Sequence, residues 1–281
     1  MRKTQRKTQQ SDRAFRAKHA LGQNFITDES LLNELADLSG VTHEDTVLEI
    51  GPGMGTLTKA LSDRSARVLA IEYDESLRPY LEVRLHGCNN VQVRFADALK
   101  VPLKQTLQEI FGEVSKLCVC ANLPYYITSE LIAKLTRELP EARSMAFMVQ
   151  REVAEKMLAA PGDEGYGPLA LTLQWRYDLR IAKEVPRECF EPQPKVDSAF
   201  VVLDRLEVSP YPVRDEAKLE RFIKGAFAMR RKTLMNNLGG LGVPREKCRA
   251  CLGVLGLPES VRAEELSLKD FCVLCDELME D

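Results

Sequence analysis

The chain has 281 residues, of which 44% are apolar and 29% are charged, a composition typical of a soluble globular protein. This composition excludes disordered, collagen-like and small disulfide-rich secreted proteins, and no stretch approaches the ~20 apolar residues of a membrane span. No secretory signal pattern opens the chain, so we expect a cytoplasmic protein with no membrane partner. The net charge of −3 argues at first against a nucleic-acid partner.

The charge is unevenly distributed along the chain. Residues 1–18 and 213–250 each carry a net charge of +6, whereas residues 251–281 carry −6 and mask them in the total. Such basic runs are either solvated surface or arms that contact phosphates. The distribution predicts that nucleic-acid affinity is sensitive to salt and depends on 213–250, with 1–18 as a second contributor.

Helical and strand patterns alternate from about residue 27. A leucine repeat at helical spacing follows Asp28, which can cap a helix. Short apolar segments, separated by helix-compatible stretches, occupy 46–50, 67–72, 91–95, 117–121 and 145–149. This alternation predicts βαβ units and a mostly parallel sheet, and continuous apolar runs are typical of strands buried on both faces.

The second half of the chain changes character. We expect two more strands at 169–181 and 198–206, with Trp175 as a core residue of the first. Residues 206–213 contain two prolines and look like a linker, after which only helical spacing continues. The chain is therefore divided into a basic arm (1–18), an α/β domain (19–206) and a small all-helical domain (207–281).

A glycine-rich segment, Glu49-Ile-Gly51-Pro-Gly53-Met-Gly55, stands where the first of these strands should turn into a helix. Glycines there permit a tight turn and a close approach to a ligand. Glu72 ends the next strand, 21 residues after Gly51, where a carboxylate can accept hydrogen bonds from ribose hydroxyls. The third glycine comes one residue early for a dinucleotide fingerprint, which disfavours a nicotinamide dehydrogenase. The spacing resembles motif I of S-adenosylmethionine-dependent methyltransferases.

Asp97 follows the third strand. An aspartate in that position is often only a turn residue or a helix cap, but it can also accept a hydrogen bond from an adenine amine. Ligands of such sheets bind at the carboxyl ends of the strands, so we expect Gly51, Glu72 and Asp97 to converge.

The segment Asn122-Leu123-Pro124-Tyr125 follows the fourth strand and is the most specific feature of the sequence. Exocyclic amines of nucleobases are poor nucleophiles, and a catalyst can help by accepting hydrogen bonds from both N–H groups. The Asn122 side-chain oxygen and a backbone carbonyl next to Pro124 are suitable acceptors, and Pro124 keeps the loop rigid. Tyr125 can stack on a flipped base while the amine attacks the sulfonium methyl group. The alternative is a structural turn with a core tyrosine.

With these motifs the chain resembles the ribosomal small-subunit adenine dimethyltransferases (the KsgA/RsmA family) from about residue 19 to 275. The resemblance implies a Rossmann-like class I methyltransferase sheet followed by a small all-helical domain. Its motifs are Leu21-Gly-Gln-Asn-Phe25, Glu49–Gly55, Ile71-Glu72, Asp97-Ala98, Asn122–Tyr125, Gln150-Arg-Glu-Val-Ala154, Pro194-Lys-Val-Asp-Ser198 and Arg230-Arg-Lys-Thr233.

The resemblance also implies a reaction and a set of site residues. Such enzymes use S-adenosylmethionine to place two methyl groups on N6 of each of two adjacent adenosines. These adenosines lie in the 3′-terminal hairpin of small-subunit rRNA within an assembling subunit, and we expect a monomeric enzyme. The implied cofactor residues are Asn24, Ile26, Gly51, Glu72, Asp97 and Asn122, and the implied catalytic residues are Asn122, Leu123, Pro124 and Tyr125. The implied rRNA contacts in the helical domain are Arg230, Arg231 and Lys232.

Other hypotheses remain at this stage. A large-subunit rRNA methyltransferase shares most of these motifs, and a non-catalytic nucleic-acid-binding factor could share the fold. Family members usually carry Tyr-Gly-Arg-Leu-Ser where this chain has Tyr166-Gly-Pro-Leu-Ala170, so an RNA or scaffold contact at Pro168 and Ala170 is in doubt.

Two Cys-x-x-Cys pairs, Cys248/Cys251 and Cys272/Cys275, have a spacing compatible with a four-thiolate zinc site. Both pairs also continue apolar helical stripes, and cysteine is a good small core residue. We favour the core interpretation and expect no metal.

Overall fold

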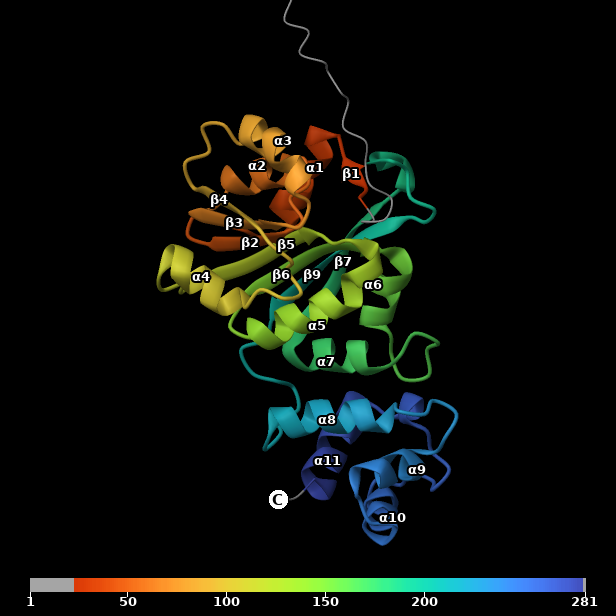
Figure 1. The fold of residues 1–281 in the computed structure, drawn as a ribbon. Coiled ribbons are helices and arrows are strands. Elements are labelled where there is room, and N and C mark those ends of the chain that lie inside the picture. Colours follow the sequence, from red (N-terminus) through yellow and green to blue (C-terminus); the bar gives the residue numbers. More distant parts are fainter. Residues whose placement is uncertain (1–22, 280–281) are drawn as a thin grey trace, which may run out of the picture.

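The computed structural model describes residues 23–279, so the basic arm expected at 1–18 lies outside the described range. A seven-stranded sheet lies between helices on both faces, and a second group of helices extends from one end of this layered body (Figure 1). In residues 23–279 no helix is both long and apolar enough to span a bilayer.

The main sheet has the strand order β4-β3-β2-β5-β6-β9-β7, and within it only β9 runs antiparallel to its neighbours. The strands predicted at 46–50, 67–72, 91–95, 117–121, 145–149 and 198–206 are confirmed to within one residue at each end, whereas the one predicted at 169–181 is not. Their bounds are β2 Thr46–Ile50, β3 Arg67–Glu72, β4 Val91–Phe95, β5 Leu117–Asn122, β6 Ser144–Gln150, β7 Tyr177–Val185 and β9 Ser198–Arg205. A separate two-stranded ribbon joins β1 (Phe25–Ile26) to β8 (Phe190–Glu191).

Helices cover both faces of the sheet (Figure 1). On one face lie α1 (Glu29–Leu38), α2 (Thr56–Ser62) and α3 (Arg78–Arg84), and on the other lie α4 (Leu103–Phe111), α5 (Thr128–Glu138) and α6 (Arg151–Leu158). The expected cap of α1 is confirmed, because the Asp28 carboxylate accepts hydrogen bonds from the N–H groups of Ser30 (2.8 Å) and Leu31 (3.3 Å). Short 3₁₀ turns lie at Glu75–Leu77, Tyr125–Ile127, Arg187–Cys189, Gly239–Leu241 and Ala263–Glu265.

The strand predicted at 169–181 is wrong over most of its length, because Pro168–Arg176 form helix α7 and only the residues from Tyr177 belong to β7. Leu173 packs into the core beneath the sheet, whereas Leu171 and Trp175 pack into the core of the C-terminal helices. A helix with apolar residues on two faces lacks the single stripe that identifies a surface helix, so its sequence resembles a buried strand.

After β9 the described chain is helical, as predicted, with α8 (Glu216–Ala226), α9 (Leu234–Leu238), α10 (Arg245–Val254) and α11 (Leu268–Leu278). Trp175 is buried as expected, and its indole N–H donates a hydrogen bond to the carbonyl of Tyr211 in the linker (2.8 Å). Tyr166, in the loop before α7, also contacts the C-terminal helices, since its hydroxyl donates a hydrogen bond to the carbonyl of Leu266 (2.8 Å). Ala170 is fully buried in the helical core, so residue 170 is not available for an RNA contact.

Candidate active site

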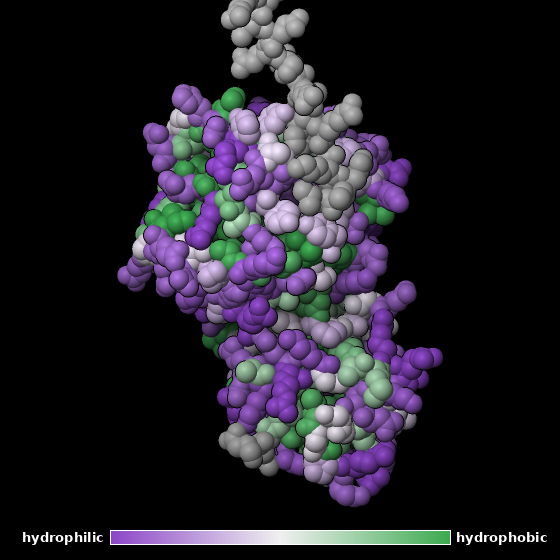
Figure 2. Space-filling model, viewed as in Figure 1, coloured by the Kyte–Doolittle hydropathy of each residue, from purple (hydrophilic) through white to green (hydrophobic). Residues whose placement is uncertain are grey.

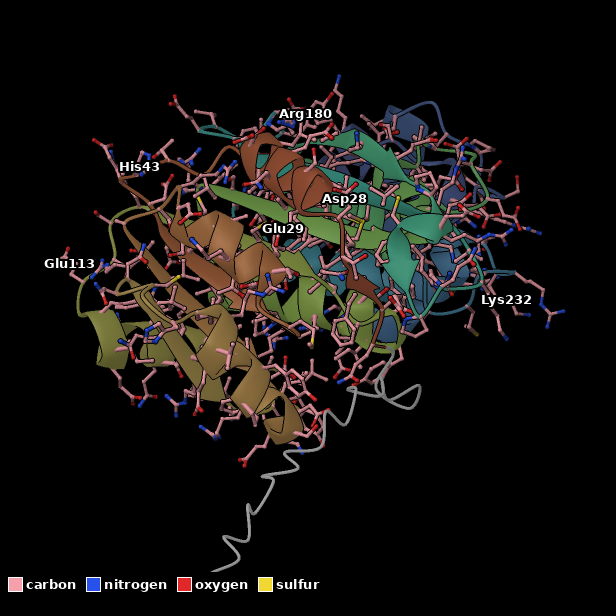
Figure 3. All side chains as sticks on the ribbon, turned by 90° about the horizontal axis from the view of Figure 1, so that it is seen from above. Asp28, Glu29, His43, Glu113, Arg180 and Lys232 are labelled. Atoms are coloured by element: carbon pink, nitrogen blue, oxygen red, sulfur yellow. The ribbon has the colours of Figure 1, made fainter. Side chains whose placement is uncertain are left out.

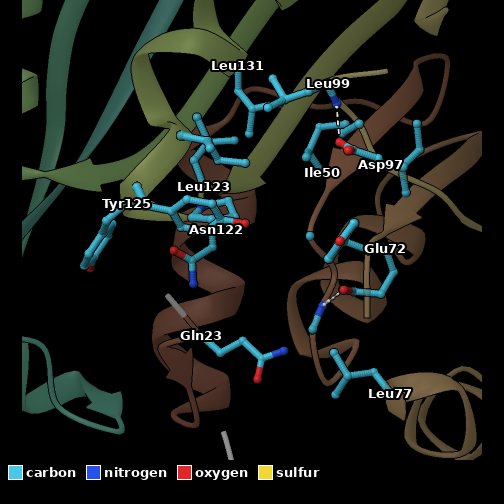
Figure 4. Close-up of a pocket in the computed structure, with 18 of the residues that line it drawn as sticks. Gln23, Ile50, Glu72, Leu77, Asp97, Leu99, Asn122, Leu123, Tyr125 and Leu131 are labelled. Carbon is cyan, nitrogen blue, oxygen red and sulfur yellow. Dashed lines mark hydrogen bonds between the residues drawn. The ribbon is translucent and has the colours of Figure 1, made fainter. Parts of the chain in front are cut away.

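A cavity of about 410 Å³ opens at the sheet edge where the parallel strands β2, β3, β4 and β5 end. Gly51 follows β2, Glu72 ends β3, Asp97 follows β4 and Asn122 ends β5, and all four residues line this cavity. Carboxyl ends of parallel strands meet at one edge, which explains why residues so far apart in sequence converge. Figure 4 shows Asn122 and Tyr125 on one wall and Glu72 and Asp97 on the opposite wall.

The glycine loop is fitted closely to its surroundings. Gly53 has φ +58°, and a Cβ there would lie 2.6 Å from a ring carbon of Phe25. The Gly53 N–H donates a hydrogen bond to the Glu72 carboxylate (3.1 Å), which ties the loop to the end of β3. Only glycine satisfies both the backbone conformation and this close approach.

Two buried carboxyl groups lie at the loop. Burial raises the pKa of Glu72, whose second oxygen accepts a hydrogen bond from the N–H of Asp74 (2.7 Å). Burial, with a smaller contribution from the nearby Glu72, raises the pKa of Glu49 to about 8. Glu49 lines a small cavity of about 30 Å³ beside Gly51 and Asn122, and its Oε2 has no hydrogen-bond partner among the described residues.

Asp97 acts both as a turn residue and as a residue of the cavity wall. One carboxylate oxygen accepts a hydrogen bond from the N–H of Leu99 (3.0 Å), and the other lies 3.2 Å from the Lys100 ammonium. The same side chain lines the cavity (Figure 4), so its role in the turn fixes the carboxylate where a ligand can reach it.

The Asn122 amide is oriented by the segment that precedes α1. Its Nδ2 donates a hydrogen bond to the backbone carbonyl of Asn24 (3.0 Å), and a carbonyl can only accept. The amide oxygen is therefore left as an acceptor for a ligand.

The structure also distinguishes the two carbonyls near Pro124. The Pro124 carbonyl already accepts hydrogen bonds from the Thr128 hydroxyl (3.0 Å) and the Ile127 N–H (3.2 Å). The Leu123 carbonyl accepts none from residues 23–279, so it is the second acceptor available at the cavity.

Tyr125 is held at the far end of its ring, where its hydroxyl lies 2.6 Å from the hydroxyl of Ser198 on β9. Burial raises the pKa of Tyr125, so the phenol stays neutral. Two tyrosines that the sequence analysis did not assign, Tyr73 and Tyr126, also line the cavity and are 61% and 59% exposed. The only sequence signal that could have identified them is that each is an aromatic residue directly after a proposed binding residue, Glu72 or Tyr125.

The remaining expected site residues are Asn24 and Ile26, next to the cavities, and the three cations of the helical part. Asn24 lines the large cavity, whereas Ile26 is 4% exposed, packs beside Phe190 of β8 and lines the small cavity beside Gly51 and Asn122. Arg231 and Lys232 are exposed on the helical part, and Lys232 projects into solvent in Figure 3. Arg230 behaves differently, because its guanidinium donates a hydrogen bond to the Glu164 carbonyl (2.8 Å) and lies 3.8 Å from the Glu264 carboxylate.

The cysteine pairs lie on α10 and α11. Cys248, Cys272 and Cys275 are buried in the helical core, and burial raises the pKa of Cys272 and of Cys275 to about 12. These thiols therefore stay protonated at neutral pH. Over residues 23–279 no group of three or more histidine, cysteine and acidic side chains is arranged to hold a metal ion.

One cavity of a mostly parallel sheet is surrounded by three features. They are a glycine loop whose spacing differs from the dinucleotide fingerprint, carboxylates at the ends of the next two strands, and an Asn-Leu-Pro-Tyr segment. This combination defines an S-adenosylmethionine-dependent methyltransferase of the Rossmann-like class that acts on exocyclic amines.

The chain belongs to the ribosomal RNA adenine dimethylase family, whose sequence profile matches residues 14–280. It is 41% identical over 267 residues to the ribosomal RNA small subunit methyltransferase A of Ligilactobacillus salivarius, covering 94% of this chain and 90% of that protein. The corresponding protein of Geobacillus thermodenitrificans is 38% identical over 270 residues, covering 94% and 92%. The enzyme is thus an S-adenosylmethionine-dependent rRNA adenine dimethyltransferase, and the dehydrogenase alternative is excluded.

Solved structures agree with this assignment. A dimethyladenosine transferase from Plasmodium falciparum superimposes with a TM-score of 0.73 at 28% identity, covering 89% of this chain and 95% of that one. The 23S rRNA methyltransferase ErmE gives a TM-score of 0.69 at 25% identity, covering 92% and 100%. In each case the similarity covers most of this chain.

Proposed function

We propose that this enzyme dimethylates N6 of two adjacent adenosines in the 3′-terminal hairpin of small-subunit rRNA, and that it acts on an assembling subunit as a cytoplasmic monomer. The two relatives described above are named for the small subunit and are 41% and 38% identical to this chain. ErmE, which is named for 23S rRNA, is 25% identical. The observation that carries the chemistry is the single cavity at which Glu72, Asp97 and the Asn122–Tyr125 segment meet.

The cavity fits S-adenosylmethionine, which supplies an electrophilic sulfonium methyl group when bound. Glu72 and Asp97 give one wall a negative character that suits a cationic ligand, and the unpartnered oxygen of Glu49 lies beneath the glycine loop. We assign Glu72 to the ribose hydroxyls and Asp97 to the adenine amine. Asn24 and Gly51 contact the remainder of the cofactor, and Ile26, which lines the small cavity beside Gly51, completes this part of the proposed site.

The opposite wall is suited to the target base. The Asn122 amide oxygen and the Leu123 carbonyl can accept hydrogen bonds from the two N–H groups of an adenine amine, which orients the nitrogen lone pair. Pro124 keeps the two acceptors at a fixed separation, and Tyr125 provides the stacking face for the flipped base. No strong base is required, because orientation supplies most of the acceleration.

The helical domain is the proposed rRNA-binding part, and its surface on the face shown in Figure 2 is mostly hydrophilic. Within the described chain, four exposed cations of 213–250 form neither an ion pair nor a hydrogen bond, which leaves them available to phosphates. They are Arg221, Lys224, Arg231 and Lys232. Arg230 is assigned instead to the contact with the 160–167 loop.

Labelled S-adenosylmethionine and small subunits that lack N6,N6-dimethyladenosine provide the direct test. We expect label in N6,N6-dimethyladenosine of small-subunit rRNA only, at two neighbouring positions near its 3′ end. Purified large subunits serve as the control substrate. Label in large-subunit rRNA, or none in either, would refute the proposal.

A further inference from the structure

Tyr125 and Ser198 are far apart in sequence but their hydroxyl groups lie 2.6 Å apart. Ser198 is the last residue of the Pro194–Ser198 motif, which carried part of the family resemblance but was assigned no role of its own. We propose that Ser198 is a positioning residue, which fixes where the axis of the Tyr125 ring points and so sets the place at which the target adenine stacks. The inference rests on the proposed function of Tyr125.

The Ser198 hydroxyl is placed rigidly. Ser198 is 1% exposed, and on β9 it pairs with Gln150 of β6 on one side and with Val185 of β7 on the other. Its neighbour Asp197 fastens the same end of the strand, since its carbonyl accepts from the Arg151 N–H (3.0 Å) and its carboxylate accepts from the Arg187 N–H (3.0 Å).

The hydrogen bond acts on the ring in a specific way. The phenolic oxygen lies on the axis that runs from Cβ through the ring, so a bond at this oxygen fixes where the axis points without restricting rotation about it. At the other end the backbone is held by Pro124, whose carbonyl is bonded by Thr128 and Ile127. Tyr125 is therefore fixed at both ends, and the position of its ring is preorganised before any base arrives.

Burial supports the pairing. Ser198 is shielded from water and Tyr125 is half-buried, so each hydroxyl relies on the other, and removal of one partner leaves a poorly solvated polar group. The turn that follows β5 and the first residue of β9, 73 residues apart in sequence, are thus joined at the proposed base site by one short contact.

The test is a double-mutant cycle on methyl transfer. Ser198→Ala and Tyr125→Phe remove the same hydrogen bond from opposite sides. We expect each to lower the single-turnover rate constant with saturating enzyme by about 3- to 10-fold, which corresponds to a typical hydrogen bond. The double variant should be no slower than Tyr125→Phe alone, and the dissociation constant for S-adenosylmethionine should not change.

Ser144→Ala is the matched control, because Ser144 is also 1% exposed, lies on neighbouring β6 and bonds to Cys118 rather than to the cavity. It should lower the melting temperature without changing the rate constant. If Ser198→Ala behaves like this control, or if the two substitutions are additive, the inference is overturned. A Tyr125→Ala variant distinguishes a failure of this inference from a failure of the proposed function, because a normal rate for this variant would overturn the role of Tyr125 itself.

Discussion

At the scale of single residues, the orientation of Asn122 is set by the Asn24 carbonyl before any ligand binds. Asn122→Ala removes the acceptor for the target amine, so we expect methyl transfer to fall by at least ~100-fold, comparable with the loss of a preorganised transition-state contact. Binding of small subunits, measured by filter retention, should stay close to that of the wild type. Loss of both activity and binding would show that Asn122 is a structural residue.

Glu49 makes the ligand-free enzyme sensitive to pH. Its pKa is about 8 in the folded chain, against 4.5 for an exposed glutamate. Between these values the folded state holds more protons than the unfolded state, so the free energy of unfolding falls as the pH rises. Glu49→Gln keeps the shape without the charge, and we expect its melting temperature to depend less on pH between about 5 and 8 than that of the wild type. If calorimetry shows the same dependence of melting temperature on pH for the variant and the wild type, Glu49 is ionised in the folded chain.

Gly53 tests the glycine loop. A Cβ at this position would lie 2.6 Å from the Phe25 ring in a backbone conformation with φ +58°. Gly53→Ala should therefore weaken binding of S-adenosylmethionine by 10-fold or more through displacement of the loop and of Phe25. Gly87→Ala is a suitable control, because Gly87 also has positive φ but its Cβ would meet nothing within 4 Å. Similar affinities of the two variants in calorimetric titration would contradict the argument.

Much of the site could be predicted from the sequence because strand ends converge in a parallel sheet. Gly51, Glu72, Asp97 and Asn122 were each recognisable from their place after an apolar run. Ser198 was not, because its contact with Tyr125 depends on the path of the antiparallel strand β9, which local spacing does not reveal.

At the scale of elements, the strands were predictable and α7 was not. Strands β2 and β3 are short apolar runs and β4 alternates apolar and polar residues, so local pattern is sufficient to identify all three. Helix α7 has apolar residues on two sides because Leu173 faces one core and Trp175 faces another. Its periodicity is therefore hidden, and only tertiary packing identifies it as a helix.

The position of α7 between two cores gives a testable result. Leu171→Ala removes a fully buried side chain from the helical core, which should cost about 2–5 kcal/mol of unfolding free energy. Because α7 also contacts the core beneath the sheet, we expect the chemical denaturation curve to remain a single transition. A separate, earlier transition of the C-terminal helices would show that the two cores unfold independently.

At the scale of the whole molecule, net charge is a poor guide to the partner, since it averages over the four exposed, unpaired cations that lie within 213–250. Replacing Arg231 and Lys232 by glutamine should weaken small-subunit binding and reduce the salt slope of log K by about one per lost phosphate contact. Arg230→Gln should leave the slope unchanged, because its guanidinium is already bonded to Glu164. It should instead speed hydrogen exchange in 160–167. An equal slope change for Arg230 and Arg231 would contradict this division.

Strand β9 runs between the proposed base site and the linker to the C-terminal helices. It is paired with β6 from Ser198 to Asp204 and with β7 from Ser198 to Arg205, so its eight residues, at a rise of about 3.3 Å each, cannot be stretched. One end faces the tyrosine of the proposed base site, and the other leads into the linker that Trp175 anchors. The strand therefore sets a fixed distance between the proposed rRNA-binding helices and the proposed base pocket. We therefore expect the enzyme to select its adenosines by their distance from the proposed docking site, so that lengthening the rRNA between the two by one base pair should move the methylated position.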